Sequence, residues 1–283
     1  MLAVFNIAGL NIQMDINTEI FIDGAIQPFK IEAAKGAFDI SYSFIPCEQS
    51  PNELLKPEYR IDVSQFAEHY LINGAYYRKS KMGGYDSCLS FDINRFDELK
   101  CFVSTPKNGE YAPVLSCLLA FELPLLQFGG FSLHSSLVKY KGRAVLFSAP
   151  SGTGKSTQAR LWQTHLGAET INGDRALLRK LSRGWQAYGS PWAGTSCIYR
   201  QESAEKPIVF IVRQSANNRV TELSKAEAFK LILSEAQVQH WQPQLMAKSC
   251  DLIEQFVRET PIYFLECRPD LGAVNAALEI VEG

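Results

Sequence analysis

The stretch that most constrains this chain spans residues 144–157, where the apolar run Ala-Val-Leu-Phe leads through small residues into Gly-Lys-Ser-Thr. An apolar strand, a turn of small residues and a helix starting at Gly-Lys-Ser bring successive backbone N–H groups together at the helix N-terminus. The helix dipole adds positive potential there, which favours a bound anion. The stretch therefore predicts a strand, a phosphate-binding loop and a helix.

This loop follows the pattern Gly-x4-Gly-Lys-Ser/Thr except at its first position, which is Ala149. Alanine is small enough to keep the loop compatible with the pattern. In such a loop Lys155 reaches the β- and γ-phosphates and Ser156 contacts Mg²⁺. We therefore expect ATP as the nucleotide, with phosphate contacts from Ser151, Gly152, Thr153, Gly154, Lys155, Ser156 and Thr157.

Composition and charge exclude several classes of partner. The formal net charge of -2 gives no basic footprint for nucleic acid or an anionic membrane. The seven cysteines form no Cys-x-x-Cys pair, a pattern typical of reduced thiols in a cytosolic protein. The N-terminus lacks a basic region before Asp15, and Glu122 and Pro124 interrupt the longest apolar stretch. We expect a soluble, cytoplasmic protein that binds neither nucleic acid nor membrane.

Residues 1–108 read as a small, mainly antiparallel β domain. The expected strands are 2–7, 12–16, 20–22, 38–44, 59–63, 71–78 and 87–92, separated by turn residues, and 95–99 is expected to be helical. Tyr70, Tyr76 and Tyr77 are expected to pack in the core or across strands. The alternative is that this domain presents a substrate to the second one.

A boundary is expected at residues 105–109, which are rich in polar residues, proline and glycine. A buried helix over 111–121 and a strand over 131–139 should follow. If Lys141-Gly142 is a two-residue hairpin turn, Tyr140 faces Arg143 and His134 faces Ala149. His134 would then lie at the mouth of the loop, although a lone histidine in a strand is also compatible with a purely structural role.

A strand over residues 170–179 is expected to carry Asp174 at its middle. A carboxylate on the strand after a phosphate loop is the expected second Mg²⁺ contact, next to Ser156. The alternative is that Asp174 and Arg175 are solvated hairpin charges. The small residues of 189–196 form either a loop over the site or a plain connection.

The C-terminal part reads as scaffold. A buried strand over 208–212 precedes Ser224-Lys-Ala-Glu227, which has the pattern of a capping box at the start of a helix. A helix over 244–258, a strand over 262–267 and a helix over 270–280 should complete the chain.

Several of these segments together resemble the C-terminal domain of the HPr kinase/phosphorylases and their smaller kinase relatives, which share a fold with phosphoenolpyruvate carboxykinase. The resemblance runs from about residue 126 to the C-terminus. Its matching residues are Leu-His-Ser-Ser at 133–136, the loop at 149–156, Asn-Gly-Asp-Arg at 172–175, Gly-Ser-Pro-Trp at 189–192, and the strand, cap and helix over 208–233.

The resemblance implies an α+β chain in which the small β domain is followed by a P-loop α/β domain with a mixed sheet over 109–283. It implies ATP, Mg²⁺ and phosphoryl transfer to a hydroxyl, typically that of a serine in a protein, a peptide or the free amino acid. Lys155 and Ser156 take the phosphate and Mg²⁺ roles, Asp174 takes the acidic position before Arg175, and His134 takes the position near the reacting phosphate. The expected catalytic set is therefore His134, Lys155, Asp174 and Arg175, and the expected metal ligands are Ser156 and Asp174.

The sequence departs from this family at two places. The HPr kinases have two consecutive carboxylates before the arginine, whereas here the first position is Gly173. One acid must then either coordinate Mg²⁺ or take the acceptor's proton, which leaves Asp174 and His134 as alternatives for the general base. The C-terminal signature of HPr kinases has no counterpart, which argues against HPr as the substrate and against the reverse phosphorylase reaction.

The expected activity is that of an ATP-dependent kinase acting on a hydroxyl of a small molecule or peptide. Arg175, Arg200 and Arg213 are candidates for holding substrate charge. Two rivals remain: a carboxykinase-like reaction on an oxoacid, and a nucleotide-binding regulatory or scaffold protein with little catalysis. A homo-oligomer is compatible with the sequence, which does not fix the oligomeric state.

Overall fold

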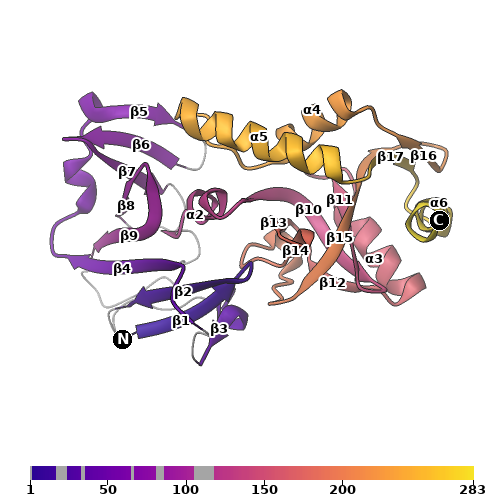
Figure 1. Cartoon of the computed structure of the whole chain (residues 1–283), viewed down its shortest axis with the longest axis horizontal. Helices are drawn as coiled ribbons and strands as arrows, with labels where there is room; N and C mark the ends of the chain where they lie inside the picture. Colours follow the sequence, from indigo (N-terminus) through magenta and orange to yellow (C-terminus); the bar gives the residue numbers. More distant parts are fainter. Residues whose placement is uncertain (1, 17–23, 33–35, 65–66, 81–85, 105–117) are drawn as a thin grey trace. The chain divides into compact units, whose positions relative to one another are not determined.

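The computed structural model describes residues 2–16, 24–32, 36–64, 67–80, 86–104 and 118–283. The chain forms two compact units, Met1–Gln127 and Phe128–Gly283, which we call the first and the second unit (Figure 1). Each unit is built on a β-sheet that contains both parallel and antiparallel neighbours. The chain therefore has the mixed α and β content expected of an α+β fold.

The first unit contains a nine-stranded sheet in the order β3-β1-β2-β4-β9-β8-β7-β6-β5. Strand β4 runs parallel to β2 and β9, and the other neighbouring pairs are antiparallel. The strands are β1 (Leu2–Ile7), β2 (Leu10–Asp15), β3 (Lys30–Ile31), β4 (Ile40–Cys47), β5 (Arg60–Val63), β6 (Ala67–Ile72), β7 (Ala75–Ser80), β8 (Ser87–Asp92) and β9 (Arg95–Ser104). Short 3-10 helices at Gln27–Phe29, Pro51–Leu54 and Pro57–Tyr59, and helix α2 (Glu122–Gln127), accompany the sheet.

Two sequence predictions for the first unit are wrong. Residues 95–99 begin strand β9 instead of a helix, because the Asp92 carboxylate accepts from the Asn94 N–H and turns the chain into a β8–β9 hairpin. Buried Phe96 and Leu99 are three residues apart, which imitates a helical period. The run 71–78 is two strands, since Asn73 and Gly74 form the turn between β6 and β7. The strand predicted at 20–22 lies outside the described residues.

The boundary predicted at residues 105–109, and most of the helix predicted at 111–121, also lie outside the described residues. Helix α2, which follows, packs against β9 and belongs to the first unit. No helix in the described part of the chain is both long and apolar enough to cross a membrane.

The second unit contains an eight-stranded sheet in the order β11-β10-β13-β14-β15-β17-β16, with β12 paired to β10. Strand β11 also pairs in parallel with β15, so the pairing of β10, β13, β14, β15 and β11 closes into a ring. The strands are β10 (Gly130–Tyr140), β11 (Arg143–Ser148), β12 (Glu169–Asn172), β13 (Arg175–Leu181), β14 (Gly184–Tyr188), β15 (Ser203–Gln214), β16 (Arg219–Glu222) and β17 (Ile262–Cys267). The helices are α3 (Lys155–Leu166), α4 (Lys225–Glu235), α5 (Pro243–Glu259) and α6 (Leu271–Glu282), with a 3-10 turn at Gly194–Ser196.

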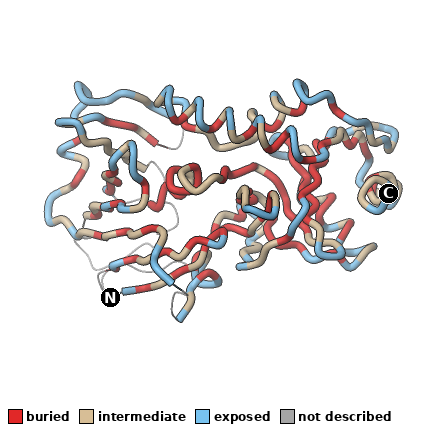
Figure 2. Tube along the Cα trace, in the orientation of Figure 1, coloured by how far each residue is buried: buried red, intermediate tan, exposed pale blue. Residues whose placement is uncertain are grey.

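Strand β15 separates two hydrophobic cores in the second unit. Val209 packs into a core shared with α4 and α5, while the next residue, Phe210, packs into a core shared with α3 and α6. Because side chains alternate along a strand, a strand buried on both faces has a continuous apolar sequence. Figure 2 shows the resulting concentration of buried residues along β10, β11 and β15.

The hairpin predicted between β10 and β11 is confirmed. Lys141 and Gly142 both have positive φ angles, +49° and +81°, as a two-residue hairpin turn of this kind requires. Tyr140 pairs with Arg143, and the register continues to Ser135 opposite Ser148. His134 therefore lies one residue beyond the last pair, where β11 ends and the glycine-rich loop begins.

Candidate functional site

The loop between β11 and α3 has two glycines with positive φ angles directly before the helix. Gly152 and Gly154 have φ angles of +80° and +125°, a region that favours glycine. Helix α3 begins at Lys155 with Gly154 as its N-cap, so no side chain from the cap accepts the first N–H groups. These amides, together with the helix dipole, form an N-terminus suited to an anion.

Lys155 folds back onto this loop. Its ammonium donates to the carbonyl oxygens of Ala149 (2.8 Å) and Pro150 (3.3 Å), and the residue is only 6% exposed. Burial lowers the pKa of the Lys155 ammonium, and the negative charges of Glu235 and Asp174 oppose that shift. The two carboxylates are thus close enough to the loop lysine to act on it electrostatically.

His134 lies between two carboxylates. Its Nε2 is 3.4 Å from Asp174 Oδ1 and its Nδ1 is 2.9 Å from Glu235 Oε2. Contact with Asp174, and next the hydrogen bond to Glu235, raises the pKa of His134, and contact with His134 lowers the pKa of Asp174. An imidazole that donates to both carboxylates must carry both ring protons, so this arrangement favours an imidazolium.

The prediction that Asp174 lies in the middle of a strand is wrong. Asp174 lies in a break between β12 and β13, where the Asn172 side-chain oxygen accepts from the N–H groups of Asp174 (2.9 Å) and Arg175 (2.7 Å). The Asn172 amide nitrogen donates to the carbonyl oxygens of Ser190 (3.0 Å) and Trp192 (3.1 Å). A buried asparagine therefore turns the chain and links this break to the loop at 190–192.

The 3-10 turn Gly194–Ser196 lies against this break. A Cβ built on Gly173 would overlap the Oγ and Cβ atoms of Ser196. A Cβ built on Gly194 would lie 2.9 Å from Asp174 Cγ. The end of the segment 189–196 thus contacts the candidate site directly, and it fills the space that a side chain at position 173 would need.

Ser156, in the first turn of α3, points toward the same break. Its Oγ donates to Gly173 O at 3.3 Å, and Ser136 Oγ on β10 donates to the same carbonyl at 2.8 Å. The structure therefore joins the two predicted metal ligands, Ser156 and Asp174, through adjacent residues of one break. Among the described residues, no group of three or more histidine, cysteine, aspartate or glutamate side chains is arranged to hold a metal.

Arg175 is the register partner of His134 across β10 and β13. Its guanidinium donates to Gln237 Oε1 at 2.6 Å. The other two arginine candidates have different surroundings: Arg200 lies 3.6 Å from Glu202, and Arg213 stacks 4.8 Å from the ring centre of Phe264. Arg175 is thus the arginine that the structure joins to the His134 cluster by strand register.

Glu235 contacts His134 and Gln237 contacts Arg175, and neither was predicted from the sequence. Both are far along the chain from their partners, and neither belongs to a recognisable local motif. One signal could have pointed to Glu235. It is the last residue of α4, where the negative end of the helix dipole disfavours a carboxylate by about 0.3–1 kcal/mol unless a cation compensates.

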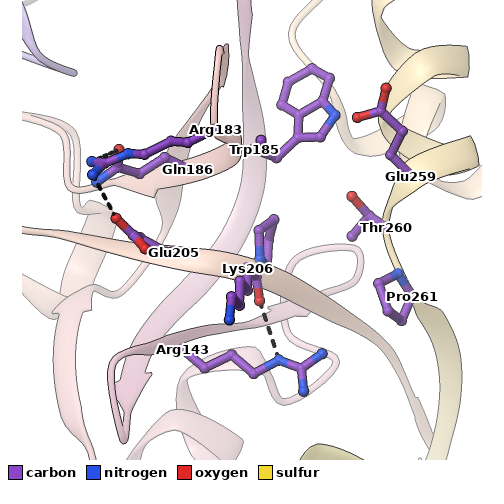
Figure 3. A pocket seen from close by; sticks show the side chains of 11 residues that line it. Arg143, Arg183, Trp185, Gln186, Glu205, Lys206, Glu259, Thr260 and Pro261 are labelled. Atoms are coloured by element: carbon purple, nitrogen blue, oxygen red, sulfur yellow. Dashed lines mark hydrogen bonds and ion pairs between the residues drawn. The ribbon is translucent and has the colours of Figure 1, made fainter.

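A separate pocket of about 260 Å³ lies at the opposite end of strand β11 (Figure 3). Its lining includes Arg143, the first residue of β11, whereas the glycine-rich loop follows the last residue of that strand. Within it, Arg183 pairs with Glu205 at 3.0 Å and Arg143 donates to Lys206 O at 3.2 Å. Both arginines are therefore bound by other residues of this chain. The pocket is not part of the His134 cluster.

No protein family and no curated protein sequence matches the chain. Among solved structures, an HPr(Ser) kinase/phosphatase from Coxiella burnetii is similar over 54% of this chain and 99% of that chain, with 12% sequence identity and a TM-score of 0.29. The likeness is distant and concerns the fold alone.

Proposed function

We propose that the second unit is an ATP- and Mg²⁺-dependent kinase that transfers the γ-phosphoryl group to a hydroxyl of a small molecule or peptide. The observation that carries the proposal is that a glycine-rich loop at a helix N-terminus adjoins an acid–histidine pair. Asp174 acts on the pKa of Lys155 and contacts His134 at 3.4 Å. Phosphoryl transfer requires these two elements together: positioned cations around the phosphates and a group for the acceptor's proton.

Lys155 and the loop amides are the groups proposed to hold the phosphates. The ammonium would exchange its bonds to Ala149 O and Pro150 O for phosphate oxygens. These carbonyls bind a cation less strongly than a phosphate does, because charge-assisted hydrogen bonds between two ions are the stronger class. Burial makes the exchange more favourable, since it disfavours an ammonium that has no anionic partner, and a phosphate would supply one.

Asp174 is the proposed acceptor of the hydroxyl proton. Contact with His134 lowers the pKa of Asp174, which keeps it ionised at neutral pH. His134, with carboxylates at both ring nitrogens, serves better as a cation than as a base. We therefore propose that the imidazolium stabilises negative charge beside the transferred group while Asp174 takes the proton.

Ser156 and Asp174 are the residues that would hold Mg²⁺, Ser156 directly and Asp174 through a bound water, so that the Asp174 carboxylate stays available for the acceptor's proton. A hydroxyl and a carboxylate are the hard oxygen donors that this ion takes, usually one or two carboxylates together with phosphate oxygens and water. Ser156 Oγ donates to the carbonyl oxygen of Gly173, the residue directly before Asp174, at 3.3 Å. When bound, Mg²⁺ would neutralise charge on the β- and γ-phosphates.

The test is ATP consumption with serine, serine-containing peptides and polyols as acceptors. We expect Lys155→Ala and Asp174→Asn each to reduce turnover, the latter on the order of 10²- to 10⁴-fold for a lost general base. Lys230→Ala and Asp251→Asn, at exposed positions on α4 and α5, are the matched controls. Turnover that survives Lys155→Ala would contradict the proposal. ATP binding without transfer to any acceptor would instead favour a regulatory nucleotide-binding protein, and oxaloacetate decarboxylation a carboxykinase-like enzyme.

A further inference from the structure

The residues that follow α4 form a short extension of the sheet beside β10. Ala236 makes an antiparallel bridge with Leu133, and the Gln237 N–H donates to Ser132 O at 2.9 Å. The Ala236 N–H still closes the last turn of α4 by donating to Ile232 O. Residues 235–237 are therefore held at both ends, by the helix on one side and by β10 on the other.

The last residue of α4 and the second residue after it contact paired residues of the sheet. His134 on β10 and Arg175 on β13 are register partners. Glu235 binds the first through its Oε2 at 2.9 Å, and Gln237 binds the second through its Oε1 at 2.6 Å. Glu235 is the last residue of α4 and Gln237 lies beside β10, so the end of the helix and the residues just after it hold two candidate site residues at once.

From this geometry we propose that Glu235 is a positioning residue for His134, an inference that rests on the proposed function. With Nδ1 bound to Glu235, the ring is fixed about its side-chain torsions, and Nε2 is directed at Asp174. A histidine that acts on a reaction through one ring nitrogen commonly has the other oriented by a carboxylate. Gln237 holds Arg175 in the same way, through a neutral amide.

The environment of Glu235 indicates that it makes a specific contact with His134 and is not a solvated surface charge. Its side chain is 13% exposed, against 28% for His134. It lies at the helix end where the dipole disfavours it, and its contact with His134 spans 101 residues of sequence. The role is thus separate from that of Asp174, which meets the other ring nitrogen from the strand break.

The kinetic test compares Glu235→Ala, Glu235→Gln and the wild type in the full chain. Glu235→Ala should reduce kcat on the order of 10- to 100-fold, as loss of an orienting partner usually does, while the KM for ATP changes less than threefold. Glu235→Gln should recover much of kcat because its amide oxygen still accepts from Nδ1–H. Glu254→Ala, an exposed glutamate on α5, is the matched control.

The second readout does not need turnover. The protein contains four histidines, so the ring-nitrogen NMR signals of His134 can be assigned by comparison with His134→Gln. In Glu235→Ala these signals should shift or broaden at fixed pH, whereas in Glu235→Gln they should stay sharp.

These readouts separate the two proposals. If the wild type phosphorylates no hydroxyl, the proposed function fails, and the NMR signals alone decide the positioning role. Unchanged His134 signals in Glu235→Ala would overturn the inference, as would a kcat within twofold of the wild type. A loss of kcat in Glu235→Gln equal to that in Glu235→Ala would also overturn it. Should Glu235→Ala fail to fold, the signals and kcat of Glu235→Gln, with those of Glu235→Leu, take its place.

Discussion

Ser196 occupies the space that the side chain of any residue larger than glycine at position 173 would need. The absence of a second acid before Asp174 is therefore built into the packing of the 3-10 turn Gly194–Ser196 against the break between β12 and β13. The cluster obtains its second carboxylate from Glu235, on a different element.

The first prediction concerns this packing. Gly173→Asp should destabilise the protein by about 1–3 kcal/mol, because an added side chain in a filled space forces its neighbours apart. Adding Ser196→Gly should recover most of that loss, since it removes the Cβ and Oγ atoms that the new side chain would meet. Urea unfolding of the two single variants and the double variant measures the coupling. If the changes in unfolding free energy of the two substitutions were additive, the side chains at positions 173 and 196 would not be in contact.

The second prediction concerns Asn172, which is fully buried and bonded on both sides of its amide. Asn172→Ala should cost about 2–4 kcal/mol, because it leaves the Asp174 and Arg175 N–H groups without their acceptor. Asn172→Asp should also destabilise, since it sets a carboxylate against the carbonyl oxygens of Ser190 and Trp192. Denaturant unfolding provides both values. An Asp variant as stable as the wild type would contradict the assigned orientation of the amide.

Local patterns predicted those parts of the second unit that local chemistry determines. The Lys141-Gly142 turn set the register that places His134 beside the loop, and the capping box at Ser224 and Glu227 has both of its hydrogen bonds. The strand over 262–267 also forms at the predicted residues. The turn and the capping box depend on contacts within a few residues, and the strand is marked by its own apolar run, so a single sequence displays all three.

The break at Asp174 and the contribution of Glu235 depend on contacts that a local pattern does not contain. Residues 170–179 have the composition of one continuous strand, but buried Asn172 bonds the loop at 190–192 and divides it. Glu235 reaches its partner across 101 residues, through the folding of α4 onto β10. Sequence periodicity indicates which face of a helix or strand is buried, whereas the break at Asp174 and the Glu235 contact arise from packing between different elements.

The third prediction concerns the pH dependence of stability at His134 and Asp174. The folded-state pKa of His134 is raised above 6.5, so its contribution is complete below pH 6.5 and is lost as pH rises through the folded pKa. The folded-state pKa of Asp174 is lowered below 3.8, so its contribution is present above pH 3.8 and is lost as pH falls through the folded pKa. The stability difference between wild type and His134→Gln should therefore be greatest between pH 3.8 and 6.5. A difference independent of pH would contradict the ion pair.

The fourth prediction concerns His69 in the first unit, which is 5% exposed and lies 3.3 Å from Asp62. Burial lowers the pKa of His69 to about 4. Because the unfolded chain then binds the proton more readily, stability should fall as pH falls from 6.5 toward 4. In His69→Gln this acid-induced loss should be smaller, as measured by thermal unfolding across that range. His165→Gln, on α3 of the second unit, is the control.

The last prediction separates the stability of the loop from its ligand binding. Lys155→Met should leave the Tm of the free protein within about 5 °C of the wild type, because an apolar chain of similar length suits a site whose burial disfavours the ammonium. The carbonyls of Ala149 and Pro150 lose a donor, which limits any gain. Adding ATP and Mg²⁺ should raise the Tm of the wild type and of Lys230→Met, since a ligand that binds only the folded state stabilises it. That rise should be largely absent in Lys155→Met. An equal rise in Tm in Lys155→Met and Lys230→Met would show that nucleotide binding does not depend on Lys155.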